Sequence, residues 1–223
     1  FIELCLNELA KCGVEEVRIH QAPESYQNNR SVHAAYELLG FDQIEELVYQ
    51  GIPIDETPLV EKMVDMQQRR LRKCKKAGFE FKHYAKSELA VAIKQIDRWR
   101  SAAQKRLSMT WADLHDSSKR NPKHYHAFAV LDGKVMIAGA IVVVVNEKVL
   151  YNFFPASYDA YNSYSPMVML VNGIYDWGRA NGFEHLDLGT SYLGKRVNTG
   201  LKTFKERIGG ETYLAKSWRK RLN

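Results

Sequence analysis

The segment DLGTSYLGKRVNTGLKTFKERIGGE, residues 187–211, decides how the rest of the chain is interpreted. Its first residues close a buried strand that we predict over Glu184–Leu188. A polar loop follows over Gly189–Gly200, and a short basic helix over Gly200–Ile208 ends in a pair of glycines. The segment is therefore a strand, a loop and a helix in that order.

The predicted helix has an apolar stripe. Leu201, Phe204 and Ile208 recur at the helical spacing of three and four residues, so this face is expected to be buried. Lys202 and Lys205 fall off the stripe and are expected to face away from it. A polar loop that leads into a helix N-terminus offers unpaired N–H groups and the positive end of a dipole, so it favours an anion. The alternative is an ordinary connection with a solvated loop.

Composition bounds the class of protein. The chain has 223 residues, 45% hydrophobic and 26% charged, which is typical of a globular protein with a real core. Its longest apolar run, Met136–Val145, is about half of a membrane span, and no stretch resembles a signal peptide. Because the sequence starts at Phe1 and not at Met, we expect it to be a fragment or to lack its first residues.

The cysteines and the charge pattern narrow the class further. Cys5, Cys12 and Cys74 are odd in number and lack a C-x-x-C spacing, which predicts neither a disulfide framework nor a metal site and favours the reducing cytoplasm. Net charge is +6, with the basic excess in the middle of the chain, above all in RRLRKCKK at 69–76. This run is either a solvated helix face or a surface for a phosphate-rich ligand such as RNA.

The start of the chain resembles its end. Residues 10–19 match residues 179–188 in pattern at an offset of 169, and at the same offset YELLG at 36–40 lies on KERIG at 205–209. Both segments predict helix, glycine, strand, polar loop, helix, glycine, strand, so we interpret them as a duplicated unit. The alternative is chance, because a helix, a glycine and a strand often follow one another.

Between these copies the pattern predicts a complete set of elements. We expect a linker at 51–58, one helix at 59–77, a strand at 79–85, a helix that begins at the N-cap Ser87, a helix at 109–119, strands at 124–131, 135–145 and 149–155, a helix from the N-cap Ser165 to Asn181, and a last strand at 212–218 before a basic tail. The apolar run within 135–145 predicts a central strand covered on both faces.

This order of elements resembles the GNAT N-acyltransferase fold, a mixed α/β (α+β) fold with a mainly antiparallel sheet covered by helices. Three segments, RRLRKCKKAGFEF, SPMVMLVNGIYDWGRANGFEHLDLG and GLKTFKERIGGE, resemble the FemABX-like branch, whose members carry two such domains in tandem. The resemblance implies that 1–58 is the back half of an incomplete first copy, 59–78 a basic connecting helix, and 79–223 a complete C-terminal domain.

The resemblance also implies a bacterial-type transferase that moves an acyl or aminoacyl group onto an amine. FemABX enzymes take amino acids from aminoacyl-tRNA and extend the peptide of a cell-wall precursor, whereas ordinary GNAT acetyltransferases use acetyl-CoA. Their pyrophosphate loop is rich in glycine, but YDAYNSYS at 158–165 has none. The donor is therefore acyl-CoA or aminoacyl-tRNA, no cofactor is held tightly, and the acceptor is a small-molecule or peptide amine. A binding module without catalysis, directed at nucleic acid or a partner, remains the alternative.

The same resemblance assigns candidate site residues. In FemABX proteins the Lys of the closing F-K segment, here Lys205, contacts the phosphates of the sugar-nucleotide substrate, and its removal is expected to weaken binding with little effect on folding. The alternative is a surface lysine paired with a carboxylate. Acyl transfer also needs a proton acceptor, for which Tyr192 and Asp187 are the candidates. The remaining substrate-binding candidates lie in the loop: Ser191, Lys195, Arg196, Asn198 and Thr199.

Overall fold

The computed structural model describes residues 1–102, 109–193 and 196–222. Prediction placed Lys195 in the site, and this residue lies outside the described ranges. The chain divides into two compact units, one of residues 1–49 with 212–223 and one of residues 50–211. Each unit is described by itself.

The first unit contains two helices and three strands. Its elements are α1 (Ile2–Lys11), β1 (Glu16–His20), α2 (Arg30–Leu38), the first part of β2 (Asp42–Pro53) and most of β11 (Glu211–Arg221). β11 lies between β1 and β2, and it pairs with β1 in antiparallel register, Glu16 opposite Arg221. Leu6, Tyr36, Phe41 and Trp218 form its buried core. The predicted basic tail is thus wrong, because Arg219–Arg221 continue the strand.

The second unit holds the larger sheet. Its elements are α3 (Leu59–Lys62), α4 (Asp65–Lys76), β3 (Glu80–His83), the 3-10 turn η1 (Lys86–Glu88), α5 (Leu89–Ala102), α6 (Trp111–Arg120), β4 (Tyr125–Asp132), β5 (Val135–Val144), β6 (Val149–Asn152), β7 (Ala156–Ser157), the turn η2 (Asp159–Tyr161), α7 (Pro166–Ala180), β8 (His185–Thr190), β9 (Tyr192–Leu193), β10 (Arg196–Val197) and α8 (Thr199–Arg207). The sheet runs from the end of β2 through β8, β6, β5 and β4 to β3.

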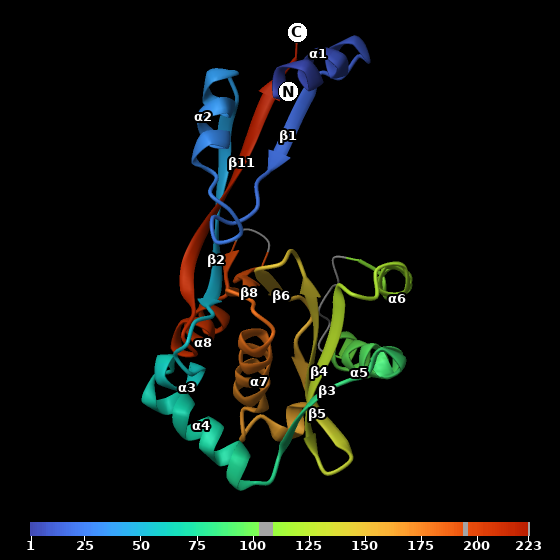
Figure 1. Cartoon of the computed structure of the whole chain (residues 1–223), viewed down its shortest axis with the longest axis vertical. Helices are drawn as coiled ribbons and strands as arrows, with labels where there is room; N and C mark the ends of the chain where they lie inside the picture. Colours follow the sequence, from blue (N-terminus) through green and yellow to red (C-terminus); the bar gives the residue numbers. More distant parts are fainter. Residues whose placement is uncertain (103–108, 194–195, 223) are drawn as a thin grey trace. The chain divides into compact units, whose positions relative to one another are not determined.

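Helices cover both faces of this sheet (Figure 1). One buried cluster joins α3, α4 and α7 to residues such as Phe128 and Val130, and the other joins α5 and α6 to Ala127 and Ile141. Strand β5 lies between β6 and β4 with Ile137–Val142 buried, so the predicted central strand is confirmed. β6 and β8 form a parallel pair, and the β3–β4, β4–β5 and β5–β6 pairs are antiparallel.

Close packing explains one glycine in α7. A Cβ built on Gly173 would lie 2.2 Å from a ring carbon of Phe81 in β3, so only glycine lets the helix approach the sheet this closely. The predicted fold class, a mixed and mainly antiparallel sheet covered by helices, is confirmed. Among the described residues, no helix is both long enough and apolar enough to cross a membrane.

Three local predictions are wrong. The predicted helix 59–77 is two helices, because Met63 and Val64 adopt extended backbone between α3 and α4. The predicted linker begins too early, since β2 continues through Pro53. Ser87 lies inside the 3-10 turn η1 and so does not cap a helix. Ser165 is the N-cap residue of α7, as predicted, but it has a left-handed conformation with φ of 57° and makes no capping bond through its side chain.

Element bounds agree with the proposed repeat. An offset of 169 maps α2 (Arg30–Leu38) onto α8 (Thr199–Arg207), and it maps β1 onto the first five residues of β8. The last residues of α1 and α7, Lys11 and Ala180, correspond in the same way, as do the first residues of β2 and β11. Whether the two copies superpose, and whether the domains end where the sequence predicts, stay predictions.

Candidate functional site at the end of strand β8

Strand β8 ends in a tight polar turn. His185–Gly189 are buried, and Gly189 has a φ of +73°, where a Cβ would also meet the ring of Tyr151 at 3.3 Å. The backbone N–H of Gly189 donates to Oδ1 of Asp187, a side chain that is 2% exposed. The strand therefore delivers a buried carboxylate and two adjacent carbonyl groups, those of Gly189 and Thr190, to one place.

Lys205 of α8 reaches these carbonyl groups. Its Nζ donates to the Gly189 oxygen at 2.7 Å and to the Thr190 oxygen at 2.8 Å, and the residue is only 4% exposed. The expectation that Lys205 faces away from the apolar stripe is wrong, and so is the alternative of a surface ion pair, whereas its contact with a substrate phosphate stays a prediction. The helix buries Ile208 and Lys205, whereas Leu201, predicted to be buried, is 39% exposed.

Burial sets the charge state of Lys205. Desolvation lowers the pKa of its ammonium from the ordinary 10.5 to about 8, and the negative charge of Asp187 opposes this shift. An ammonium has three N–H groups, and the carbonyl groups of Gly189 and Thr190 take two of them. A neutral amine keeps two N–H groups, enough for the two carbonyl groups, so the proton lost near pH 8 is that of the third N–H group. The site thus holds a cation that titrates close to neutral pH.

Ser191 is also buried, and its hydroxyl has a partner within the protein. The Oγ atom donates to Oε1 of Gln50 at 2.7 Å, and the two residues are 2% and 1% exposed. Gln50 belongs to β2, so this bond fixes the loop after β8 against a neighbouring strand. In this arrangement Ser191 positions the loop and has no exposed hydroxyl to offer.

The predicted loop contains a small hairpin. β9 and β10 pair in antiparallel register, with Val197 opposite Tyr192, and the backbone N–H of Asn198 donates to the Ser191 oxygen at 2.7 Å. Tyr192 is half-buried, whereas Arg196 is exposed. The side chain of Asn198 accepts from the backbone N–H of Leu201, so Asn198 is the N-cap of α8 and Thr199 its first residue.

Thr199 lines a separate hollow of about 350 Å³ between α8 and α4. Gly200, Gln67 and two arginines, Arg70 and Arg207, also line it. The sequence analysis missed both arginines as companions of Thr199. Arg70 lies in the basic run 69–76 and Arg207 follows Lys205 by two residues, but their proximity depends on how α4 packs, which no local pattern predicts.

Helix α4 splits into a buried and a basic face. Leu71 and Cys74 are buried, whereas the basic residues are mostly exposed. Lys73 donates to the Ser163 oxygen, and the Cys74 thiol donates to the Tyr164 oxygen at 3.2 Å. Helix α4 therefore contacts the glycine-free loop at 158–165 that precedes α7.

The histidines show no metal-binding cluster. His83 and His126 lie on paired strands with ring nitrogens 3.1 Å apart, and desolvation lowers both pKa values. Within the described residues, no group of three or more His, Cys, Asp or Glu is placed to hold a metal ion. The three cysteines are free, and Cys74 is the buried one.

Comparison with models of known families assigns the chain to one family. The sequence model of the acetyltransferase (GNAT) domain matches residues 62–206, well over half of the chain. The protein therefore belongs to the GNAT family. No protein with a curated description matches the sequence.

Solved structures share this fold at low sequence identity. FemX matches with a TM-score of 0.78 and 14% identity over 100% of this chain and 76% of its own. L-PGS from Bacillus licheniformis matches with a TM-score of 0.70 and 14% identity, over 100% of this chain and 72% of its own. The C-terminal domain of a putative lysylphosphatidylglycerol synthetase from Agrobacterium fabrum matches with 0.72 and 13%, over 99% and 71%. The predicted FemABX-like GNAT fold is confirmed.

Proposed function

We propose that this protein transfers an acyl or aminoacyl group onto an amine, and that the turn after β8 together with Lys205 is its active site. The observation that carries the proposal is the buried ammonium of Lys205, held by the carbonyl groups of Gly189 and Thr190. Burying a cation costs free energy of folding, and a neutral hydrogen-bond donor would satisfy the two carbonyl groups as well. Such a group is more often found where a reaction needs it.

The third N–H of Lys205 is the working group in this proposal. It donates to an anionic part of the substrate, either a phosphate or the oxyanion that develops when an amine attacks a carbonyl carbon. Because the surroundings are dry, a charge-assisted hydrogen bond there is stronger than at the surface. Arg196 assists from strand β10, and Asn198 and Thr199 shape the start of α8. Lys195 is included as a further substrate-binding residue on the basis of the sequence alone.

Asp187 and Tyr192 take the proton-handling roles. Asp187 favours the charged form of Lys205, so it keeps the ammonium protonated at neutral pH. Tyr192 is the first residue of β9 and follows Gly189 by three residues, directly after the turn that ends β8. In the proposed reaction one of these groups accepts the proton that the attacking amine releases.

The donor and the acceptor are proposed by analogy with related proteins. We favour an aminoacyl-tRNA donor and a peptide amine acceptor in a cell-envelope precursor. The support is the FemX likeness and the glycine-free loop at 158–165, which α4 contacts through Lys73 and Cys74. In lysylphosphatidylglycerol synthetases, as the name states, the amino acid is joined to a phospholipid; that acceptor class is to be tested beside the first.

Acetyl-CoA is the second candidate donor. The family model that matches the chain is that of an acetyltransferase domain, and GNAT enzymes use acyl-CoA as a substrate that leaves after reaction. The proposal also includes a cytoplasmic location, which the three free cysteines support. It further includes a first unit that derives from an incomplete N-terminal GNAT-like domain.

A ligand screen followed by a transfer assay tests this proposal. The melting temperature is measured with acetyl-CoA, a sugar-nucleotide peptide precursor and aminoacyl-tRNA, since a ligand that binds only the folded state raises it. Transfer of a labelled acyl or aminoacyl group is then measured with the ligand that binds. A binding module without catalysis would raise the melting temperature with RNA and transfer nothing, which would refute the proposed activity.

A further inference from the structure

A second cavity, of about 630 Å³, lies on the other side of the sheet from α7. Helix α5 forms one wall, the turn between β4 and β5 forms another, and the residues just before η2 complete it. Its volume is in the range of small-molecule sites. Of the segments named for acyl transfer, only the loop at 158–165 reaches it, through Tyr158, and Lys205 and the turn after β8 do not line it.

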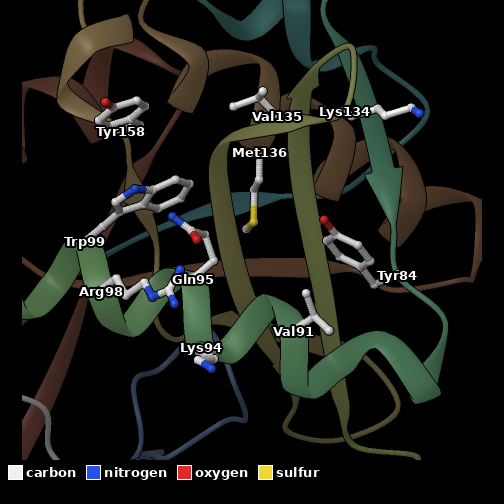
Figure 2. A pocket seen from close by; sticks show the side chains of 10 residues that line it. All are labelled: Tyr84, Val91, Lys94, Gln95, Arg98, Trp99, Lys134, Val135, Met136 and Tyr158. Atoms are coloured by element: carbon white, nitrogen blue, oxygen red, sulfur yellow. The ribbon is translucent and has the colours of Figure 1, made fainter.

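The lining combines aromatic rings with cations. Figure 2 shows Trp99 and Gln95 rising from α5 toward Tyr158, with Met136 in the centre and Tyr84 on the far side. Three basic residues complete the lining: Lys94, Arg98 and Lys134. No Asp or Glu lines the cavity, and none of the three cations forms an ion pair with a residue in the described ranges. The cavity is therefore electropositive.

The two rings on one side are arranged for a flat ligand. Trp99 and Tyr158 are parallel to within 6°, with their centroids 6.3 Å apart. A ring inserted between two others requires about 7 Å, which is more than this distance, so the two stacked rings do not enclose a ligand but form one flat aromatic surface. Tyr158 is 45% exposed, so part of this surface is open to a ligand.

Exposed apolar side chains continue the surface at the mouth. Val91 on α5 is 66% exposed and Val135 at the start of β5 is 52% exposed, and both line the cavity. Exposed valines next to cations and aromatic rings match a ligand that has an apolar plate and a negative charge. A simple inorganic anion would make no use of the rings, and a neutral aromatic compound would make no use of the cations.

We infer that this cavity binds a nucleotide, with the base stacked at Trp99 and Tyr158 and the phosphate held by Arg98 and Lys94. Stacking on aromatic rings tolerates any base, so the site selects a nucleotide over other anions more strongly than one base over another. The inference does not depend on the role proposed for Lys205. It adds a ligand site on the opposite face of the sheet from α7.

Calorimetric titration of the whole chain with AMP, adenosine and inorganic phosphate tests this inference. We expect AMP to bind at least tenfold more tightly than adenosine or phosphate. Phosphate binding as tight as that of AMP would mean simple charge attraction and would overturn the proposal, as would no AMP binding at millimolar concentration.

Variants locate the site. Tyr158→Ala removes an exposed ring and is expected to weaken AMP binding about fivefold to tenfold, and the pair Lys94→Gln with Arg98→Gln at least tenfold. The matched control is Arg72→Gln with Lys75→Gln, which removes the same charge from the exposed face of α4 and should leave AMP affinity unchanged. Equal weakening by the control pair would contradict the assignment. Because Trp99 packs against the core, Trp99→Phe tests the indole without emptying its position.

Discussion

Helices α2 and α8 occupy equivalent places in the two sequence copies, but they bury different side chains at the same position. Residue 36 is a tyrosine that is 7% exposed and packs against Phe41 and Trp218, with ring centroids 5.2 and 5.5 Å away. Residue 205, at an offset of 169, is a lysine that is 4% exposed and binds two backbone carbonyl groups. One copy uses the position for packing, and the other places a cation there.

The two side chains differ in the free energy that their burial costs. The tyrosine gives up little by being buried, because most of its surface is apolar. The lysine loses the hydration of a full charge, which the depressed pKa records. An apolar residue of similar length would fill position 205 at lower cost. We therefore interpret Lys205 as kept for chemistry and Tyr36 as kept for the core.

The largest expected effect concerns the packing copy. Tyr36→Ala empties a position among buried rings, and we expect it to lower the free energy of unfolding by about 3–5 kcal/mol. Urea denaturation measures this loss. Tyr36→Phe serves as the control, since it keeps the ring and should cost about 1 kcal/mol or less. A small effect of the alanine variant would show that residue 36 is not a core position.

The next effect concerns the cationic copy. Lys205→Met keeps the length of the side chain but removes the donor and the charge, so we expect kcat/KM for group transfer to fall by about 100-fold. The substrates are those that the ligand screen identifies. Tyr36→Phe should retain its activity under the same conditions. Wild-type activity in Lys205→Met would mean that the buried cation has no part in the reaction.

Stability should also depend on pH through Lys205. Its pKa is about 8 in the folded protein and 10.5 in the unfolded chain, so unfolding takes up a proton between these values. The free energy of unfolding contributed by this group therefore rises as pH increases from about 8 to 10.5, by up to about 3 kcal/mol. Denaturation curves of wild type and Lys205→Met at several pH values isolate the rise, which the variant should lack.

The smallest effect concerns the support of the loop. Ser191→Ala removes the donor to Gln50 and leaves a buried amide oxygen without that bond, so we expect a loss of about 1–2 kcal/mol in stability. Because the Ser191 hydroxyl is occupied within the protein, ligand affinity should change less than threefold. Thermal denaturation of this variant measures the loss of stability, and ligand titration measures the change in affinity. A large loss of affinity at unchanged stability would instead make Ser191 a direct ligand contact.

Much of the fold could be predicted from periodicity alone. The apolar run at 135–145 predicted the central strand, and the repeated helix–glycine–strand pattern predicted four elements near each end. Errors arose where tertiary packing overrides local preference. Neither Met63 nor Val64 is a helix-breaking residue, yet the backbone leaves the helical conformation there. The backbone N–H of Val64 instead donates to the backbone oxygen of Arg207.

The site was harder to predict for the same reason. Leu201, Phe204 and Ile208 gave a correct helical period, but the true buried face includes Lys205 in place of Leu201. The carbonyl groups of Gly189 and Thr190 at the end of β8 bind the lysine, and no pattern in the sequence of α8 indicates them. The capping role of Asn198 was predictable, since it depends on a bond to the third residue along the chain.

Ligand affinity as a function of pH tests the central claim that Lys205 is a functional cation. The ligand is the phosphate-bearing compound that stabilises the protein most in the screen, and its dissociation constant is measured at pH 7 and pH 9 for wild type and Lys205→Met. With a pKa of about 8, Lys205 is about one-tenth protonated at pH 9, so wild type should bind roughly tenfold more weakly there. Lys205→Met should bind weakly at both pH values with no such dependence. Equal affinity of the two proteins at pH 7, or the same pH dependence in both, would contradict the account.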